Sequence, residues 1–367
     1  MKFITQQEDL SDALQIVKTA IATKTTLPIL TYVYLKAEND NLYLQSNNLE
    51  IGLSLSMPVI VEEPGEVCLP GSLFVDIVNK LPSVSLEFSV NERNRAIIHA
   101  GYSNVEIQGE NTEEFPKLDL GNIQPQIYLN REEFLKGIKQ TIFAAAEDEI
   151  KQVLTGVLME SKDRFIYIVA VDGHRLALTK ISSSSEIPSV IIPAKSLKEF
   201  QRIISKIKTE EIGVAFLDSQ ILLKCESVYF TSRLLQGQFP SYDKIIPTDF
   251  LTGFRCNRED LLDVLERMEV LASADQTNTV KITISSQEVV LSSLTSERGA
   301  GREVIPAEIL KGEESLEIGF NVEYLIEPLE NLDSEEIELR FTSNLGPALI
   351  KIPEDESYIY VLMPVRL

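Results

Sequence analysis

One short motif occurs three times in this chain, and it constrains the fold more than any other feature. It combines acidic residues with the first apolar residues of a helix, and its copies end at Leu10, Leu135 and Leu262, which lie 125 and 127 residues apart. A repeat of this length is a whole domain rather than one unit of a solenoid. We therefore expect three similar domains, at residues 1–124, 125–249 and 250–367.

Each repeat has two segments with the apolar spacing of an amphipathic helix. The first segment of each repeat carries its apolar face on Leu10, Ala13, Leu14, Val17 and Ile21, then on Phe134, Leu135, Ile138 and Ile142, and then on Leu261, Leu262, Leu265, Met268 and Leu271. The second segments are predicted at residues 72–81, 196–207 and 321–332. Pro328 lies inside the last of these, where we expect it to kink the helix or end it early.

Short β-branched or alternating runs lie between these helices and are typical of strands. Helices combined with antiparallel strands in every repeat predict an α+β fold. Proline, glycine and polar residues gather at Gly121–Gln126 and Pro247–Gly253, where we expect linkers. The predicted strands are residues 42–44, 84–90, 96–98, 165–171, 213–216, 221–224, 280–284, 289–291, 337–341 and 358–363.

The composition indicates a soluble intracellular protein. No apolar run is long enough to span a membrane, and the first residues do not have the pattern of a signal peptide. The chain has only three cysteines, without a C-x-x-C pair, which favours a reducing cytosol and excludes a cysteine zinc site. The net charge of −22 argues against nucleic-acid binding unless the cations are concentrated in one place.

One predicted helix concentrates cations in this way. Lys195, Lys198, Arg202 and Lys206 follow one another at steps of three or four residues, so they share one helix face. A basic face on an acidic protein suggests contact with phosphates. The simpler alternative is a solvated helix surface, which would be favoured for an isolated helix. Lysines on or just beyond the other first helices, at Lys18, Lys24, Lys136, Lys139 and Lys151, shift the balance towards function.

The sequence offers little for catalysis. Asp172 and His174 follow an apolar run and could form an acid–base pair, so a metal-independent hydrolase remains an alternative. The chain lacks the G-x-S-x-G elbow, the P-loop and H-E-x-x-H, and one histidine beside one aspartate is a poor metal ligand set. A turn in which Asp172 and Gly173 set the backbone is the better explanation. We expect no catalytic residue, metal or cofactor.

The C-terminus stays apolar to its last residue. Tyr358–Leu362 reads as a final strand, but Pro364 cannot donate to a sheet. An apolar tail that contains Met363 beside a pocket would suit adaptable peptide binding. A peptide-binding scaffold unrelated to DNA is therefore a further alternative.

Taken together, several short motifs resemble the bacterial DNA polymerase III β subunit, the family of replicative sliding clamps. They are Lys2-Phe3, Thr26–Leu30, Phe115-Pro116, Asp172–Ala177, Phe239–Tyr242, Ile318–Val322 and Met363–Leu367. The resemblance covers the whole chain. It implies a head-to-tail homodimer that forms a ring around duplex DNA, without sequence specificity and without catalytic activity of its own.

The resemblance also implies partners and sites. The partners would be the polymerase III catalytic subunit, the clamp loader and other replication and repair proteins that carry a clamp-binding motif, all in the cytoplasm. They would dock in a pocket between the second and third domains that comprises Leu154, Val171, Gly173, His174, Arg175, Leu176, Pro240, Lys244, Ile245, Asn321, Tyr324, Pro347, Ala348, Val361, Leu362, Met363, Pro364, Val365, Arg366 and Leu367. The implied DNA-facing residues are Lys24, Lys151 and Lys195, which Lys198, Arg202 and Lys206 of the basic helix extend. For the dimer interface we expect Val105 to meet Leu271.

Overall fold

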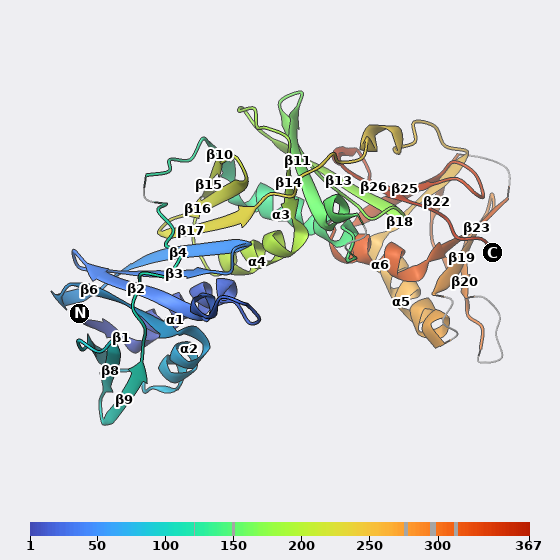
Figure 1. Cartoon of the computed structure of the whole chain (residues 1–367). Coiled ribbons are helices and arrows are strands. Elements are labelled where there is room, and N and C mark those ends of the chain that lie inside the picture. The colour runs from blue at the N-terminus through green and yellow to red at the C-terminus, as the bar shows by residue number, and fades with distance from the viewer. Residues whose placement is uncertain (121, 149–150, 275–277, 294–298, 312–314) are drawn as a thin grey trace. The chain divides into compact units, whose positions relative to one another are not determined.

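The computed structural model describes residues 1–120, 122–148, 151–274, 278–293, 299–311 and 315–367. Its described part contains two α-helices in each repeat, as the periodicity predicts (Figure 1). These helices are α1 Gln7–Val17, α2 Gly71–Lys80, α3 Arg131–Thr141, α4 Ala194–Ile204, α5 Arg258–Ala274 and α6 Val322–Glu330.

The strands follow one order in every repeat. A first strand precedes the first helix, three strands follow it, another strand leads into the second helix, and three more strands end the repeat; the first and third repeats have one additional strand just before the strand that leads into the second helix. The first repeat has β1 Lys2–Gln6, β2 Tyr32–Glu38, β3 Asn41–Asn47, β4 Ile51–Pro58, β5 Ile60–Glu63, β6 Gly65–Pro70, β7 Ser85–Val90, β8 Arg95–Ala100 and β9 Ser103–Gln108. The second has β10 Ile127–Asn130, β11 Gly156–Lys162, β12 Phe165–Val171, β13 Arg175–Ser182, β14 Val190–Pro193, β15 Glu211–Phe216, β16 Gln220–Cys225 and β17 Val228–Arg233. The third has β18 Thr252–Asn257, β19 Thr279–Ile284, β20 Val289–Ser293, β21 Arg302–Ile305, β22 Glu308–Lys311, β23 Leu316–Asn321, β24 Glu336–Phe341, β25 Ala348–Ile352 and β26 Asp355–Leu362.

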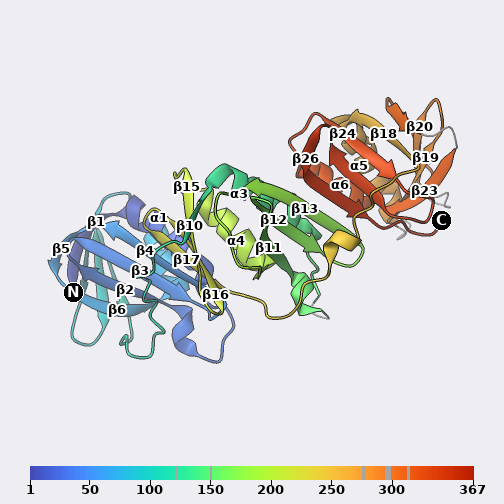
Figure 2. The same cartoon turned by 90° about the horizontal axis from the view of Figure 1, so that it is seen from above.

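The chain forms two compact units that divide the second repeat between them. The first unit comprises residues 1–132 and 195–234, and the second comprises residues 133–194 and 235–367. The first unit contains a five-stranded sheet, β5-β1-β7-β8-β9, and an eight-stranded sheet, β10-β15-β16-β17-β4-β3-β2-β6 (Figure 2). The second unit contains a nine-stranded sheet, β14-β11-β12-β13-β26-β25-β24-β18-β22, and a four-stranded sheet, β21-β20-β19-β23.

Each large sheet joins strands of two repeats at an equivalent place, which we call a seam. In the first unit, β17 pairs antiparallel with β4. In the second unit, β26 pairs antiparallel with β13. In both seams, the last strand of one repeat pairs with the fourth strand of the preceding repeat. The last strand of the first repeat, β9, and the fourth strand of the third repeat, β21, each stand at the end of a sheet.

Apolar helix faces form the cores, as their spacing predicts. Leu10, Leu14 and Val17 of α1 are buried, and α1 packs beside α2. In the third repeat α5 packs against α6 and against β19 and β20. At about 25 cal/mol for each Å² of apolar surface removed from water, such faces supply the main stabilisation of both units.

Several helix and strand boundaries differ from those that the sequence predicts. Helix α4 ends at Ile204 rather than at residue 207, so Lys206 lies in the turn after the helix, off the predicted basic face. Helix α6 starts after its cap Asn321 and ends at Glu330 rather than at residue 332, two residues after Pro328, so the expected early end is confirmed. Strand β18 starts at Thr252, so the second predicted linker ends earlier than Gly253. Gly121, the start of the first predicted linker, lies outside the described residues.

Candidate functional site

A tight turn between β12 and β13 stands at the centre of the predicted pocket. The Asp172 carboxylate accepts hydrogen bonds from the backbone N–H groups of His174 at 2.8 Å and Arg175 at 3.0 Å. Gly173 adopts φ +101°, a conformation that favours glycine. In this Asx-turn the Asp172 carboxylate stabilises the backbone of the turn, and Gly173 and His174 are exposed.

The side chain of Arg175 is buried and has four different partners within the second unit. Its Nε donates to Asp172 Oδ2 at 2.9 Å, one terminal nitrogen contacts the Glu327 carboxylate of α6, and the other donates to the Phe143 carbonyl at 2.8 Å. The guanidinium also lies 4.2 Å from the centroid of the Tyr324 ring. With 9% of the residue exposed, the guanidinium is held inside the protein and does not line an open surface.

Helix α6 supplies the opposite side of the site. Asn321 caps the helix by accepting a hydrogen bond from the Glu323 N–H at 2.9 Å. Tyr324 lies near His174, with ring centroids 6.4 Å apart, and its carbonyl accepts a hydrogen bond from Tyr360 Oη at 2.7 Å. Burial raises the pKa of the Tyr324 phenol, and the nearby Asp172 carboxylate adds to this effect. The ring therefore stays neutral at physiological pH.

The C-terminal tail runs from the turn to the four-stranded sheet. The Met363 N–H donates to the His174 carbonyl at 2.9 Å, and the Val365 N–H donates to the Gly319 carbonyl at 2.9 Å. Gly319 has no side chain that could clash with Leu367, which packs over it. Met363 is 42% exposed, which leaves its thioether available to a partner.

An apolar cluster lies beneath the turn. It includes four predicted pocket residues, Leu154, Val171, Leu176 and Val361, all buried. Leu362 and Ala348 are also buried. These side chains form the floor of the predicted site, and Gly173, His174 and Met363 are among its exposed residues.

A cavity of about 490 Å³ opens beside this cluster, and two of the predicted residues line it, Leu154 and Pro240. The other lining residues are Lys151, Gln152, Val153, Gln238, Phe239 and Ser241. Lys244 and Ile245 are exposed just after Tyr242, which belongs to the apolar cluster. Pro347 accepts a hydrogen bond from the Thr342 hydroxyl at 2.9 Å, and Pro364 and Arg366 lie along the tail.

A polar network fixes the segment that carries Tyr242, and no sequence motif indicated it. Lys162 Nζ lies 2.7 Å from Tyr242 Oη, 2.9 Å from a Glu160 carboxylate oxygen and 3.1 Å from Asp243. Tyr242 Oη in turn donates to Glu160 at 2.7 Å. Burial lowers the pKa of the Lys162 ammonium, but its hydrogen bonds to these three residues outweigh burial and raise it overall.

The predicted DNA-facing cations are all exposed. They are Lys24, Lys195, Lys198, Arg202 and Lys206 in the first unit and Lys151 in the second. Arg202 is engaged on the surface, 2.7 Å from Glu199 and 3.0 Å from the Thr19 hydroxyl. Lys195 and Lys198 project from the same helix, whose opposite face is buried through Leu197 and Phe200.

The two predicted dimer residues lie near free sheet ends. Val105 is partly exposed on β9. Leu271 of α5 packs against β21, since a Cβ placed on Gly301 would lie 2.7 Å from Leu271 Cδ1. Sequence reasoning assigned no strand to β9 or β21, so it did not identify the edges beside these residues.

Several groups that could serve catalysis are buried or engaged. Cys68, Cys225 and Cys256 are buried, and burial raises the pKa of each thiol to about 12, so none is a thiolate at neutral pH. No cluster of three metal-binding side chains occurs among the residues that the structure describes. In the same part of the chain, no helix is long and apolar enough to cross a membrane.

Three family models match consecutive parts of the chain. They describe the N-terminal, central and C-terminal domains of the DNA polymerase III beta subunit, at residues 1–119, 128–241 and 243–366. The chain belongs to the DNA polymerase III beta subunit family.

Relatives of this family match over their full length. The beta sliding clamp of Bacillus subtilis is 32% identical over 380 residues, with 100% of both chains covered. That of Staphylococcus epidermidis is 31% identical over 376 residues, which is 100% of this chain and 99% of the relative. The crystal structure of the DNA polymerase sliding clamp from Bacillus subtilis superimposes with a TM-score of 0.93 at 31% identity, covering 100% of this chain and 99% of that one. The DNA polymerase III beta chain of Streptococcus pneumoniae gives 0.93 at 30% identity, with 100% of both chains covered.

Proposed function

We propose that two copies of this chain close a ring around duplex DNA and tether the replicative polymerase to it as a processivity factor. Membership of the beta subunit family supports this function. The observation that carries it is the repeated seam, because the last strand of one repeat pairs with the fourth strand of the preceding repeat in each unit. This pairing leaves one last strand, β9, and one fourth strand, β21, each with a free edge.

The free edges of β9 and β21 define how the ring would close. Strand β17 pairs with β4, and β26 pairs with β13. By the same rule, β9 of one copy pairs with β21 of the other, and the second copy returns the pairing. Such a contact is head-to-tail, and two of them close a ring and cover the free edges of β9 and β21. The domains at 1–124, 125–249 and 250–367 would then follow one another around the hole.

The ring resolves the conflict between net charge and DNA binding. Basic side chains concentrated on the inner wall would meet phosphates, while the acidic surface stays outside. The residues proposed for this wall are Lys24, Lys151, Lys195, Lys198, Arg202 and Lys206. Because such contacts are sequence-independent and release counterions, they let a ring slide.

The partner pocket is proposed at the Asp172–Leu176 turn. A peptide would reach His174, Met363 and the cavity at Leu154 and Pro240, and the buried apolar cluster would hold this surface in place. The remaining predicted residues, Lys244, Ile245, Asn321, Tyr324, Pro347 and Pro364 to Leu367, would form its rim. We assign Arg175 to positioning, because its guanidinium is fully used within the protein.

The proposal includes no catalytic step and no cofactor. The partners would be the polymerase catalytic subunit, the clamp loader and other proteins with a clamp-binding motif, and the site of action would be the bacterial cytoplasm. The raised thiol pKa values and the structural use of the Asp172 carboxylate support a binding role over hydrolysis.

Loading on circular DNA tests the function. Protein loaded on nicked circular DNA is expected to stay bound and to be released when one cut linearises the circle. Equal release from both forms would refute the topological tether. The mass in solution provides a second measurement, because a chain that remains monomeric at micromolar concentration cannot form the proposed ring.

A further inference from the structure

The C-terminal tail is anchored through its backbone at two points, one on each side of Pro364. The Met363 N–H donates to the His174 carbonyl at 2.9 Å, and the Val365 N–H donates to the Gly319 carbonyl at 2.9 Å. Gly319 belongs to β23, an end strand of the four-stranded sheet, so Val365 adds to the free edge of that strand. Because proline fixes its own φ, the two anchors together restrict the backbone around Met363.

Each repeat holds the segment that follows its last strand at this same place. In the first repeat the Glu110 N–H donates to the Cys68 carbonyl at 2.9 Å, and in the second the Leu235 N–H donates to the Ile191 carbonyl at 2.9 Å. Cys68, Ile191 and Gly319 are equivalent, because each is the third residue before the second helix of its repeat. The third repeat therefore differs from the other two in having no side chain at this position.

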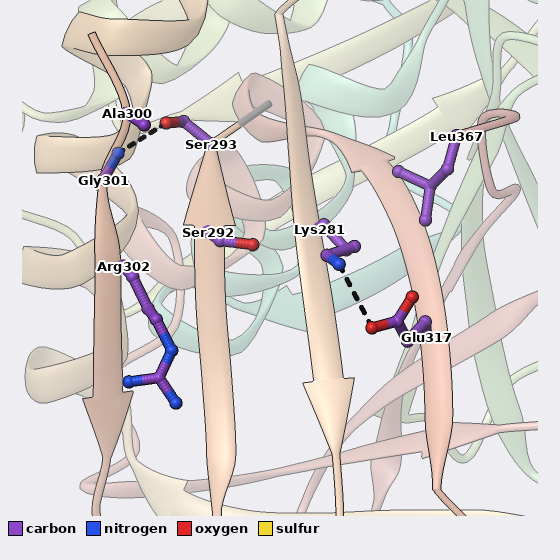
Figure 3. Close-up of a pocket in the computed structure, with 8 residues that line it drawn as sticks. All are labelled: Lys281, Ser292, Ser293, Ala300, Gly301, Arg302, Glu317 and Leu367. Atoms are coloured by element: carbon purple, nitrogen blue, oxygen red, sulfur yellow. Dashed lines mark hydrogen bonds and ion pairs between the residues drawn. The ribbon is translucent and has the colours of Figure 1, made fainter. Parts of the chain in front are cut away.

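The missing side chain makes room for Leu367. A Cβ added to Gly319 would lie 2.7 Å from Leu367 Cδ2, 3.0 Å from Leu367 Cγ and 3.2 Å from the Val365 carbonyl oxygen. Carbon atoms pack best at about 3.5–4.0 Å, so a larger residue would displace the tail. Leu367 would move into the cavity of about 450 Å³ that it borders with Lys281, and Val365 would be drawn from its anchor. Figure 3 shows Leu367 beside β23, with Lys281 on the neighbouring strand.

A side chain at residue 319 would act on the tail rather than on the core. The neighbouring residues Ile318 and Phe320 are fully buried, and strand alternation turns Gly319 to the opposite face of the sheet. On that face Gly319 lies in a row of directly opposed residues with Lys281 of β19 and Ser292 of β20. A β-branched residue suits a strand, so the sheet itself should accept one at this position.

We infer that Gly319 is a positioning residue for partner docking, because it gives Leu367 its place over β23 and so holds Met363 at the surface that a partner peptide would reach. The inference rests on the proposed peptide pocket and adds a residue that lies outside it. Leu367 then serves the pocket as an anchor, whereas the exposed thioether of Met363 contacts the peptide. Binding to a tail that is already ordered loses less conformational entropy than binding to a free one.

Peptide docking by a Gly319→Ile variant tests the inference. This change gives the third repeat the residue of the second. It is expected to raise the dissociation constant of a synthetic peptide with a clamp-binding motif at least about tenfold, measured by isothermal titration calorimetry on the whole chain. Hydrogen exchange at the Met363 and Val365 amides should become at least about tenfold faster, since both anchors are loosened.

The matched control is Ser292→Ile. It places the same side chain in the same row of the same sheet, two strands away from Gly319. This variant should bind the peptide like the wild type and leave the exchange of the tail amides unchanged. Thermal unfolding of each variant verifies that it is folded.

A second background separates an effect through Leu367 from any other effect of the substitution. In a Leu367→Ala variant the side chain that residue 319 would displace is already absent. Adding Gly319→Ile to that variant should therefore weaken docking by less than about threefold, because two residues that act through one contact are not additive.

The outcomes distinguish the inference from the proposed pocket. A Gly319→Ile variant that binds the peptide as tightly as the wild type would overturn the inference and leave the pocket intact. A loss of docking with unchanged exchange at the tail amides, or an equal loss in the Leu367→Ala background, would also overturn it. A wild-type protein that does not bind the peptide would refute the pocket itself.

Discussion

The two seams within the chain have the same backbone pairing and opposite side-chain chemistry. The row across the first seam is Tyr34, Gln45, Ser54 and Tyr229. The equivalent row across the second is Leu158, Val169, Leu178 and Ile359. One sheet face is therefore polar and the other apolar. An apolar peptide would gain burial only at the second seam, which accounts for a single proposed partner pocket in each chain.

The turns beside the two seams are also equivalent. In the first unit the Asn48 side-chain oxygen accepts hydrogen bonds from the N–H groups of Glu50 at 3.0 Å and Ile51 at 2.7 Å, as Asp172 does from His174 and Arg175. Leu49 adopts φ +72° where Gly173 adopts φ +101°. The turn is thus shared by the first two repeats, and the second carries Arg175 where the first carries Ile51.

The chain segments that leave the first and second repeats are held by different means, at Leu118 and at Tyr242 respectively. Gln45 in the first unit accepts from the Leu118 N–H at 2.9 Å and donates to its carbonyl at 3.0 Å. Tyr242 is held in the second unit by Lys162 and Glu160. A cavity of about 440 Å³ beside the first of these segments is lined mainly by polar residues, including Ser54 and Tyr229. Similar backbones therefore support one polar and one apolar surface.

Exchanging one residue between the seams should have the largest effect on stability and on peptide docking. Leu178→Ser gives the second seam the residue of the first, removes a fully buried side chain and leaves a hydroxyl in an apolar cluster, which should destabilise the second unit by about 4 kcal/mol. Denaturant unfolding measures the loss, and fluorescence anisotropy should show that a clamp-binding peptide no longer docks. The matched exchange Ser54→Leu should leave docking unchanged; loss of docking there would contradict the assignment to the second seam.

Removing the buried guanidinium should have the next largest effect. Arg175→Ala leaves the Asp172 and Glu327 carboxylates without their cation, which should cost about 3 kcal/mol. Isoleucine occupies the equivalent place at the first seam, so Ile51→Val, which should cost only about 1 kcal/mol, is the control. If Arg175→Ala unfolds at the same denaturant concentration as the wild type, the ion pairs do not hold the turn.

Truncating the tail should affect binding without affecting stability. Met363 is 42% exposed, so Met363→Ala should change the free energy of unfolding by less than about 0.5 kcal/mol. It should weaken peptide docking at least about tenfold, because a flexible thioether would be lost from the apolar surface. Val270→Ala, at another exposed apolar position, should leave docking intact. Isothermal titration calorimetry measures the peptide affinity of both variants. A Met363→Ala variant that binds the peptide as tightly as the wild type would exclude Met363 from the pocket.

The smallest effect should be a pH dependence confined to the segment of residues 110–120. Burial alone would raise the pKa of the Glu66 carboxyl, but hydrogen bonds from Thr112, Tyr34 and Lys117 lower it from 4.5 to about 2. A depressed pKa stabilises the folded state above the ordinary value, so this contribution should be lost as pH falls from about 4.5 to about 2. Limited proteolysis of the 110–120 segment should increase over that range, and Glu66→Gln should already be sensitive at neutral pH. A wild-type segment that is equally protected at pH 2 would contradict the assignment.

The helices were predictable because their information is local. The spacing of Leu10, Leu14 and Val17 sets one apolar face whatever lies opposite it. The end of α4 was not predictable, since Ile207 continues the apolar period although the helix stops at Ile204. Strand β9, with Ser103, Asn104 and Glu106, carries too much polar sequence to read as a strand, and its pairing with β8 overrides that composition.

Periodicity and motifs in the sequence are sufficient to identify the number of repeats, the α+β class, the amphipathic helices and the family. These follow from periodicity and from residues that are close along the chain. The tertiary structure alone decided which residues share a sheet row, that Arg175 points into the protein, and that β9 and β21 are left at sheet ends. The physical reason is that strand register pairs residues far apart in sequence, such as Ser54 with Tyr229, and a shift of one residue would turn every side chain to the other face.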